Sequence, residues 1–418
     1  MKSRLAKLCM SILFLSMIVA SCAPTPAVEE TEVVEVEYPP APEYIELGSS
    51  ISLQGKYGSL GNMILPGYEI AVEHINADGG VFVAEYNTKI PLRLTYYDDE
   101  SDPTKAVSKM ETLFSDLDLT AYLGGGGSEM HAASAGIAEK NKVPYCGIAF
   151  ALYTIHQQGY KYLFSPFPKS PQQAKDVFTI LNEYIAEGER PTKVAIFTYS
   201  DDWGQELGDL WEENATESGY EVVVREENPP GVNDWTNAIL KAKSAGAEVL
   251  LTVPVFPDGS GMFKMMAELD WTPKFSLVTR ASEGLNWGTD MGTVGDYATM
   301  QAGWHNGANF PGADELNASY EDKYERPADV LTGSAYACVQ IIAAAIEEAG
   351  TLDPEAVRDA ITAIDVETVM GQVTFNEDGT GNVWDPLMQW QNGKIELVWP
   401  KDHATADFLY PAPPFDER

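Results

Sequence analysis

Short apolar runs alternate with amphipathic stretches over residues 51–128, and this segment ends in a glycine run that leads to Ser128. Between the runs, apolar residues recur at the i, i+3, i+4, i+7 spacing of a helix that covers a sheet: Tyr68, Ala71, Val72 and Ile75. Strands that alternate with helices form parallel sheets with helices on both faces. The pattern therefore predicts an α/β fold, with strands near residues 47–53, 92–97, 121–123 and 143–146.

The glycine run, Gly124 to Gly127, indicates where a ligand binds. Ligands of parallel α/β sheets bind beyond the carboxyl ends of the strands. A glycine-rich loop that ends in Ser at a helix start lets backbone N–H groups and a hydroxyl converge on an anionic group such as a carboxylate. The run lacks the Gly-Lys-Ser/Thr of a phosphate loop and the closing Gly of a nucleophile elbow. It predicts a binding site rather than a catalytic one.

A second alternating block follows the first. We expect strands near residues 194–198, 221–225, 249–253 and 275–279, with helices near 203–218, 234–245 and 262–269. The chain is long enough for two lobes of ordinary domain size. Near the carboxyl end, residues 373–375 and 387–390 flank a turn at 376–379 and are interpreted as an antiparallel hairpin.

The order of these motifs resembles that of a known family. The pattern Gln54-Gly55-Lys56-Tyr57-Gly58, the helix at 66–80, the acidic stretch at 97–106 and Gly127-Ser128 are similar to type I periplasmic binding proteins. That family includes the Leu/Ile/Val-binding and amide-binding proteins of ABC importers. The resemblance extends over about residues 47–400. It implies two Rossmann-like lobes with parallel sheets, joined by three crossover segments and closing over a ligand like a Venus flytrap.

The lobe boundaries come from the resemblance alone. Crossings are expected near residues 164–168, 300–304 and 370–375. They place residues 47–166 and 302–369 in the first lobe, residues 167–301 and 370–400 in the second, and residues 401–418 in a tail.

Four site positions follow from the family pattern. Ser128 would hydrogen-bond the ligand carboxylate, although a helix N-cap is an alternative role for a serine there. Ala151 stands where amino-acid binders carry Thr, and Trp203 where they carry Tyr. Glu283 is the nearest carboxylate for pairing with a ligand ammonium. These departures argue against a plain aliphatic α-amino acid.

Aromatic residues are frequent in the loops predicted to border the cleft. Their faces give large contact area and can hold a cation or another ring, and packing in the core is the alternative. They predict a ligand with a carboxylate or amide end and an apolar or aromatic body. The residues are Tyr57, Phe150, Tyr153, Trp203, Phe256 and Trp304.

The amino terminus has the pattern of an exported lipoprotein. Basic residues precede an apolar run at 8–20 that is shorter than the roughly 20 residues of a membrane span and is typical of a secretory signal. The run ends in Val19-Ala20-Ser21-Cys22, which resembles a lipobox. We expect a signal peptide at 1–21, lipidation of Cys22, and a flexible acidic, Pro-rich tether at 22–46 that holds the protein at the cell envelope.

The chain carries 63 acidic and 27 basic residues, a formal charge of −36. Nucleic acid is excluded as a partner because phosphates require a basic surface, and apart from its lipid the chain is not expected to adsorb to anionic headgroups. The negative electrostatic field of the chain slows the approach of ligands with a net negative charge and leaves zwitterions unaffected at long range.

The sequence indicates no metal and no cofactor. The histidines lack metal-ligand spacing, and Asp98-Asp99-Glu100 is interpreted as a strand end and helix start rather than a cation site. Beyond Cys9 and Cys22, only Cys146 and Cys338 remain, and we expect both to be buried free thiols.

The expected function is that of a solute-binding lipoprotein that delivers a small molecule to an ABC permease. A ligand-sensing receptor domain that reports to a membrane signalling partner is the alternative. An enzyme such as an amidase would need a Ser or Cys with a paired base, and none is found.

Overall fold

The computed structural model describes residues 37–232 and 234–418. The expected signal peptide, Cys22 and the tether up to residue 36 lie outside the described residues. Residues 37–43 are exposed and have no regular structure, and the first strand begins at Ile45. In the described part of the chain, no single helix is long and apolar enough to cross a membrane, and one bent pair, α10 (Thr332–Ala349) with α11 (Pro354–Ala363), has the length and composition to do so only when the two helices are taken together.

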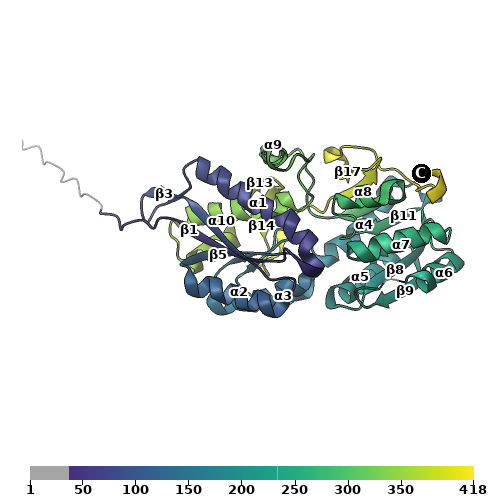
Figure 1. Ribbon diagram of the computed structural model, residues 1–418, viewed down its shortest axis with the longest axis horizontal. Helices are drawn as coiled ribbons and strands as arrows, with labels where there is room; N and C mark the ends of the chain where they lie inside the picture. Colours follow the sequence, from purple (N-terminus) through teal and green to yellow (C-terminus); the bar gives the residue numbers. More distant parts are fainter. Residues whose placement is uncertain (1–36, 233) are drawn as a thin grey trace, which may run out of the picture. The chain divides into compact units, whose positions relative to one another are not determined.

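The first sheet has five parallel strands in the order β4-β1-β5-β6-β7. Helices α1 and α10 pack together, as do α2 and α3, and the two pairs cover the sheet (Figure 1). We call this sheet and its helices the first lobe. Its strands are β1 Ile45–Ile51, β4 Leu92–Asp98, β5 Leu119–Leu123, β6 Tyr145–Cys146 and β7 Leu163–Phe164; its helices are α1 Gly58–Ala77, α2 Pro103–Asp116, α3 Ser128–Asn141, α9 Ala313–Tyr324, α10 Thr332–Ala349 and α11 Pro354–Ala363.

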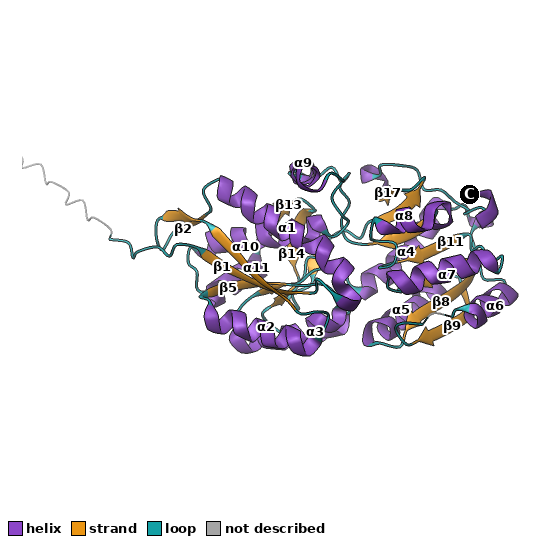
Figure 2. Cartoon of the chain, viewed as in Figure 1, coloured by secondary structure: helices purple, strands orange, loops and turns teal. Residues whose placement is uncertain are grey.

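The second sheet has seven strands in the order β17-β16-β12-β11-β10-β8-β9, and we call it, with its helices, the second lobe (Figure 2). Five strands are parallel, and β16 and β17 add an antiparallel edge. The strands are β8 Lys193–Tyr199, β9 Glu221–Asn228, β10 Val249–Thr252, β11 Phe275–Val278, β12 Ala298–Gln301, β16 Leu387–Gln391 and β17 Lys394–Trp399; the helices are α4 Ser170–Tyr184, α5 Asp202–Glu217, α6 Thr236–Ala245, α7 Phe256–Glu268 and α8 Asn286–Met291.

The predicted fold class is confirmed: two α/β lobes, each built on a parallel sheet. The alternation of strand and helix carried this prediction, because β1, β5, β10 and β11 are buried along their whole length, as expected for strands covered on both faces.

The predicted hairpin between residues 373–375 and 387–390 is wrong. Strand β14 (Gly371–Phe375) pairs with β13 (Asp365–Thr368) and β15 (Gly381–Asn382), whereas β16 pairs with β12 and β17. The small β13-β14-β15 sheet packs on α10 and α11 of the first lobe. The third crossing, expected near residues 370–375, is therefore placed at 383–386. A second two-stranded sheet joins β2 (Val81–Val83) to β3 (Thr88–Ile90).

The expectation of two free thiols is also wrong. Cys146 ends β6, Cys338 lies within α10, and the two form a disulfide with their Cα atoms 5.8 Å apart. Their separation of 192 residues concealed this proximity, because most of the second lobe, from α4 to β12, lies between them in the sequence. The bond joins the two halves of the first lobe covalently.

Candidate functional site

The first lobe contributes a wall built mainly from backbone. After β5 the glycine run turns sharply, with φ of +89° at Gly126 and +86° at Gly127, a region that side chains rarely adopt. A Cβ on Gly127 would lie 3.1 Å from the ring of Tyr57, so the loop also needs glycine for space. The Gly127 N–H donates to Ala149 O at 2.9 Å, which fixes the run against the loop after β6.

Ser128 opens α3 at the end of this run. Gly127 occupies the N-cap position, so a capping role does not account for the Ser128 hydroxyl. The side chain is 3% exposed, and its Oγ has no hydrogen-bond partner among the described residues. Burying such a group unpaired costs about 1–3 kcal/mol. Together with the free N–H groups of the first helical turn, the hydroxyl forms a site for a hydrogen-bond acceptor.

The second lobe contributes a wall built from large side chains. Trp203 lies in the first turn of α5 and donates from Nε1 to Ser170 Oγ at 3.2 Å. Arg280 follows β11, and its guanidinium carbon lies 4.0 Å from the centre of the Trp203 ring and 5.6 Å from that of Tyr57. The aromatic faces of the two rings hold the cation between the lobes.

Glu283 completes this wall and is 4% exposed. Its Oε1 accepts a hydrogen bond from the Arg280 backbone N–H at 2.9 Å. Burial raises the pKa of the Glu283 carboxyl to about 7, against the opposing effects of that hydrogen bond and the nearby Arg280 charge. The carboxyl therefore changes its charge close to neutral pH.

These residues surround a cavity of about 20 Å³ between the lobes. A single water needs about 10–15 Å³ measured in this way, so the cavity admits little more than one water. Arg280 and Trp203 fill much of the cleft, and a small organic solute would enter only if the side chains or the lobes moved. Ser128, Trp203 and Arg280 also line an adjoining space of about 330 Å³ that forms the mouth of the cleft.

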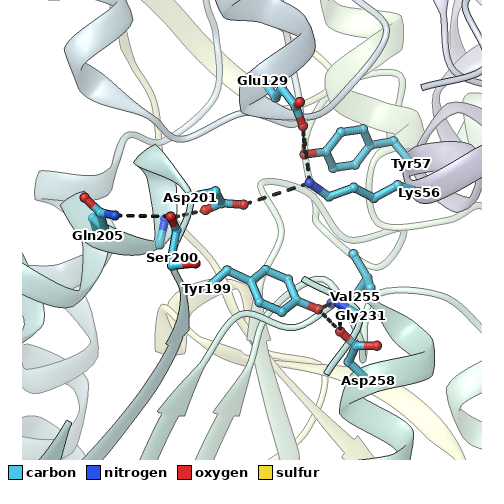
Figure 3. Close-up of polar contacts among 11 residues, drawn as sticks. Lys56, Tyr57, Glu129, Tyr199, Ser200, Asp201, Gln205, Gly231, Val255 and Asp258 are labelled. Atoms are coloured by element: carbon cyan, nitrogen blue, oxygen red, sulfur yellow. Dashed lines mark hydrogen bonds and ion pairs between the residues drawn. The ribbon is translucent and has the colours of Figure 1, made fainter. Parts of the chain in front are cut away.

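A charged network crosses the mouth (Figure 3). Lys56 Nζ of the first lobe lies 3.2 Å from Glu129 Oε2 and 4.0 Å from Asp201 Oδ2 of the second lobe. The Tyr57 hydroxyl donates to Glu129 Oε2 at 3.3 Å. Deeper in the second lobe, the Tyr199 hydroxyl donates to Asp258, whose carboxylate also accepts the Gly231 N–H. Lys56 thus contacts both lobes, whereas the Tyr199 group stays within one.

Six of the nine residues predicted for the site lie together. Ser128, Phe150, Ala151, Trp203 and Glu283 line the cavity, and Tyr57 lines its mouth.

Tyr153, Phe256 and Trp304 lie elsewhere. Tyr153 donates to Asp378 and faces a separate hollow of about 770 Å³ beside the third crossing. Phe256 packs edge-on against Trp287, 6.5 Å between ring centres. Trp304 is fully buried and donates to Val369 O at 2.9 Å. Phe256 and Trp304 thus pack against other side chains, and Tyr153 faces a hollow other than the cavity, because a loop that follows a strand can direct its side chain away from the cleft as readily as toward it.

Two residues of the site, Arg280 and Lys169, were not predicted from the sequence. Arg280 lies within residues 279–283, where the family pattern predicts an acidic residue. Lys169 is buried beneath the cleft, where Nζ donates to Phe150 O at 2.8 Å and to Ser165 Oγ at 2.6 Å. Burial holds the pKa of Lys169 well below its usual value. No pattern in the sequence distinguishes this lysine, since its burial depends on the way the first crossing folds.

Among residues 37–232 and 234–418, no group of three or more His, Cys, Asp or Glu side chains is placed to hold a metal ion. In the acidic stretch at 98–100, Asp99 accepts hydrogen bonds from the hydroxyls of Ser50 and Ser52 and from the Ser101 N–H. The stretch is interpreted from the sequence as a strand end and helix start, and in the structure β4 ends at Asp98 and α2 begins at Pro103.

The chain is similar to known proteins over most of its length. Residues 44–394 match the family model described as periplasmic binding protein. A Leu/Ile/Val-binding protein homologue of Brucella abortus is 26% identical over 390 residues, covering 89% of this chain and 95% of that protein.

Solved structures share the fold. A leucine-binding protein from Thermotoga maritima has a TM-score of 0.76 and 21% identity, covering 86% of this chain and 99% of the other. A solute-binding protein of an R. palustris ABC transporter, solved in complex with benzoate, has a TM-score of 0.73 and 18% identity, covering 88% and 99%.

Proposed function

Because the chain belongs to the periplasmic binding protein family, we propose that it is the solute-binding component of an ABC importer. It would bind a small organic carboxylate, such as a branched-chain amino acid or a related acid, between its two lobes and present the closed form to a permease. Leucine and benzoate, the compounds named for two structural neighbours, share a carboxylate on an apolar body. The family relationship also supports export from the cytoplasm.

The observation that carries the proposal is the Ser128 hydroxyl. It is buried, lacks a partner among the described residues and lies at the amino end of α3, where the helix dipole favours a negative group. A ligand carboxylate would supply the missing acceptor. The cost of the unpaired hydroxyl would then be recovered on binding.

The two-lobe arrangement provides the means of capture. Ligand contacts come from both lobes, so full affinity requires closure, and a hinge at the crossings would absorb the change in backbone angles. The 20 Å³ cavity supports this view, because a solute of amino-acid size needs the lobes to separate before it can be enclosed. Binding would then shift the population toward the closed form.

A binding screen tests the proposal. Thermal-shift measurements with amino acids, aromatic acids, amides and sugars should identify a ligand, which at about 100 times its Kd adds roughly 2.7 kcal/mol of stability. Calorimetry on Ser128→Ala should then show a loss of about 1–3 kcal/mol in binding. If no solute in the panel binds the wild-type protein, the proposal is wrong.

A second serine in the same helix provides the control. Ser134 is also 3% exposed, but it does not line the cavity. Ser134→Ala should leave affinity within about twofold. An equal loss of affinity in both variants would mean that Ser128 acts through the packing of α3 rather than through the ligand.

Lipid anchoring at Cys22 forms part of the proposal and depends on the lipobox pattern at residues 19–22. Cys22→Ala should release the protein from the membrane fraction of cells that express it. Retention of the variant in that fraction would exclude the lipid as its anchor.

A further inference from the structure

We infer that Arg280 is a specificity-determining residue that makes the cleft select net-anionic ligands, namely carboxylates without a compensating ammonium group. The inference rests on the proposed function and narrows its substrate class. The family pattern predicts an acidic residue near this position and does not predict Arg280.

Two buried groups of the cavity lack a hydrogen-bond partner among the described residues, and both can donate: Ser128 Oγ from the first lobe and Arg280 Nη1 from the second. The amide nitrogen of Gln301, which also lines the cavity, already donates to Gln173 O and to Asp385. A ligand carboxylate can accept from both unpartnered groups, and the Arg280 guanidinium supplies a positive charge to neutralise it.

Arg280 differs from other buried or half-buried arginines of the chain. Arg225 pairs with Asp209, Glu212 and Glu227, and Arg326 pairs with Asp329. Arg280 forms no ion pair among the described residues, although acidic residues outnumber basic ones more than twofold in the sequence. Arg190 and Arg418 also lack an ion pair, but their guanidinium groups donate to backbone carbonyls, whereas the Arg280 guanidinium makes no hydrogen bond among the described residues. The ring faces of Trp203 and Tyr57 hold the guanidinium but leave its N–H groups free to bind a ligand.

The backbone at Arg280 is also unusual. Its φ is +71°, in the left-handed region that a non-glycine residue adopts at a cost of about 1–3 kcal/mol. On the opposite wall Ala149 has φ of +56°. Strain of this kind is concentrated at ligand sites, and here it occurs on both sides of one cavity.

The remaining charged group of the cavity does not favour an ammonium. Glu283 has one oxygen engaged by the Arg280 N–H, and burial raises the pKa of its carboxyl to about 7. A ligand ammonium would need this carboxylate ionised. When the ligand has no ammonium, Glu283 can stay protonated and donate a hydrogen bond. Ser128, Arg280 and Glu283 can then all donate to one ligand carboxylate.

Two matched series of ligands test the inference by calorimetry on the purified full chain. The first series is leucine, 4-methylpentanoate and 4-methylpentanamide; the second is phenylalanine, 3-phenylpropanoate and 3-phenylpropanamide. Within each series the body stays the same and the charge changes from zwitterion to anion to neutral. In at least one series the anion should bind about tenfold or more tightly than the other two, since hydrogen bonds to charged groups contribute about 1.5–3 kcal/mol.

Arg280→Gln should weaken binding of the preferred anion by about 10–100-fold and that of the matching amide by less than threefold. Arg280→Lys keeps the positive charge but not the planar guanidinium, so it should lose less affinity for the anion than Arg280→Gln. Arg225→Gln changes an arginine of the same lobe that does not line the cavity, and it should leave every affinity unchanged. The circular dichroism spectrum and the melting temperature establish that each variant is folded.

Association rates give a second readout. Because the chain is strongly acidic, the association rate of the anion should rise between 20 and 200 mM salt, while that of leucine stays constant. This dependence should remain in Arg280→Gln, since it reflects the whole molecule, and the affinity loss in that variant should appear in the dissociation rate.

Each possible outcome either supports the inference about Arg280 or contradicts it. If leucine or phenylalanine binds most tightly, and Ser128→Ala but not Arg280→Gln weakens it, the inference is wrong and the proposed function stands. If Arg280→Gln weakens anion and amide equally, the residue shapes the cleft without selecting charge. If none of the six compounds binds, this inference is wrong and the proposed binding of carboxylates fails with it.

Discussion

The two walls of the cleft are built in different ways. On the first lobe, the wall is a glycine loop and a helix start, and its polar groups are backbone N–H groups and the Ser128 hydroxyl. On the second lobe, the wall consists of the large side chains of Trp203, Arg280 and Glu283. The first lobe is also closed by a disulfide, whereas both cysteines of that bond lie outside the second lobe.

Because of this difference, we expect the two walls to contribute to ligand binding in different ways. A wall made of backbone can hold any carboxylate, because N–H groups are present whatever the sequence. A wall made of side chains can be altered by single substitutions, so discrimination between ligands should reside there. The following predictions test whether the first lobe supplies general affinity and stability and the second supplies selectivity.

The largest effect is expected from the disulfide. Replacing Cys146 and Cys338 together with Ser should destabilise the first lobe by about 2–5 kcal/mol, since the bond constrains a long loop in the unfolded chain. Hydrogen exchange followed by mass spectrometry should show lost protection in β1 and β5 and unchanged protection in β8 and β10. Reduction of the wild-type protein should reproduce the result. Equal loss of protection in both lobes would show that they unfold as one unit.

Glu283 should make stability depend on pH. Its pKa near 7 in the folded protein exceeds the value of 4.5 for an unperturbed glutamate, so the folded state holds the proton more tightly. The stabilisation is complete below about pH 4.5 and is lost as pH rises through 7, by about 3 kcal/mol in all. Denaturant titrations of the wild type and Glu283→Gln should differ by this pH-dependent amount. The exposed Glu268→Gln variant should show the same dependence of stability on pH as the wild type. A difference in stability between Glu283→Gln and the wild type that does not change with pH would contradict the assignment of this pKa to Glu283.

One substitution in each wall tests this expectation directly. Gly127→Ala places a side chain at φ +86° beside Tyr57 and should weaken all carboxylates by a similar amount, about 1–3 kcal/mol. Trp203→Leu should weaken 3-phenylpropanoate more than 4-methylpentanoate, by about 0.5–1.5 kcal/mol, because ring contacts are lost. Calorimetry with both acids measures the two effects. If Gly127→Ala changed the ranking of the acids and Trp203→Leu did not, the roles of the walls would be reversed.

The smallest effect is expected at the mouth. Lys56→Met removes the contact with Asp201 and should reduce ligand affinity by less than about 1 kcal/mol, because partly exposed ion pairs contribute little. The reduction should disappear at 1 M salt. Lys140→Met removes the pair with Glu111, which lies within the first lobe, and should not affect binding at all. A loss from Lys56→Met that persists in high salt would mean that the lysine acts by packing.

Local patterns in the sequence were sufficient to predict the fold and the first wall. Helical spacing, buried strands and a run of glycines are properties of neighbouring residues, so Ser128 and the α/β class could be identified.

The second wall and the disulfide depend on contacts between distant segments. Arg280 is distinctive because its guanidinium has neither an ion pair nor a hydrogen bond among the described residues, and this property is visible only in three dimensions. Cys146 and Cys338 meet although most of the second lobe lies between them in the sequence. Likewise, β16 pairs with β12, from a distant part of the chain, and with β17 rather than with β14.

The position of the disulfide also determines the order in which the molecule can be completed. A chain that emerges amino end first exposes Cys146 early, but its partner Cys338 appears only after every residue of α4 to α8 has emerged. During that interval the second lobe has most of its sheet and can begin to fold, while the first lobe still lacks α10. The synthesis of the first lobe thus begins earlier, but its disulfide can form only after α10 has emerged. Until then Cys146 remains a free thiol, open to reaction with other cysteines.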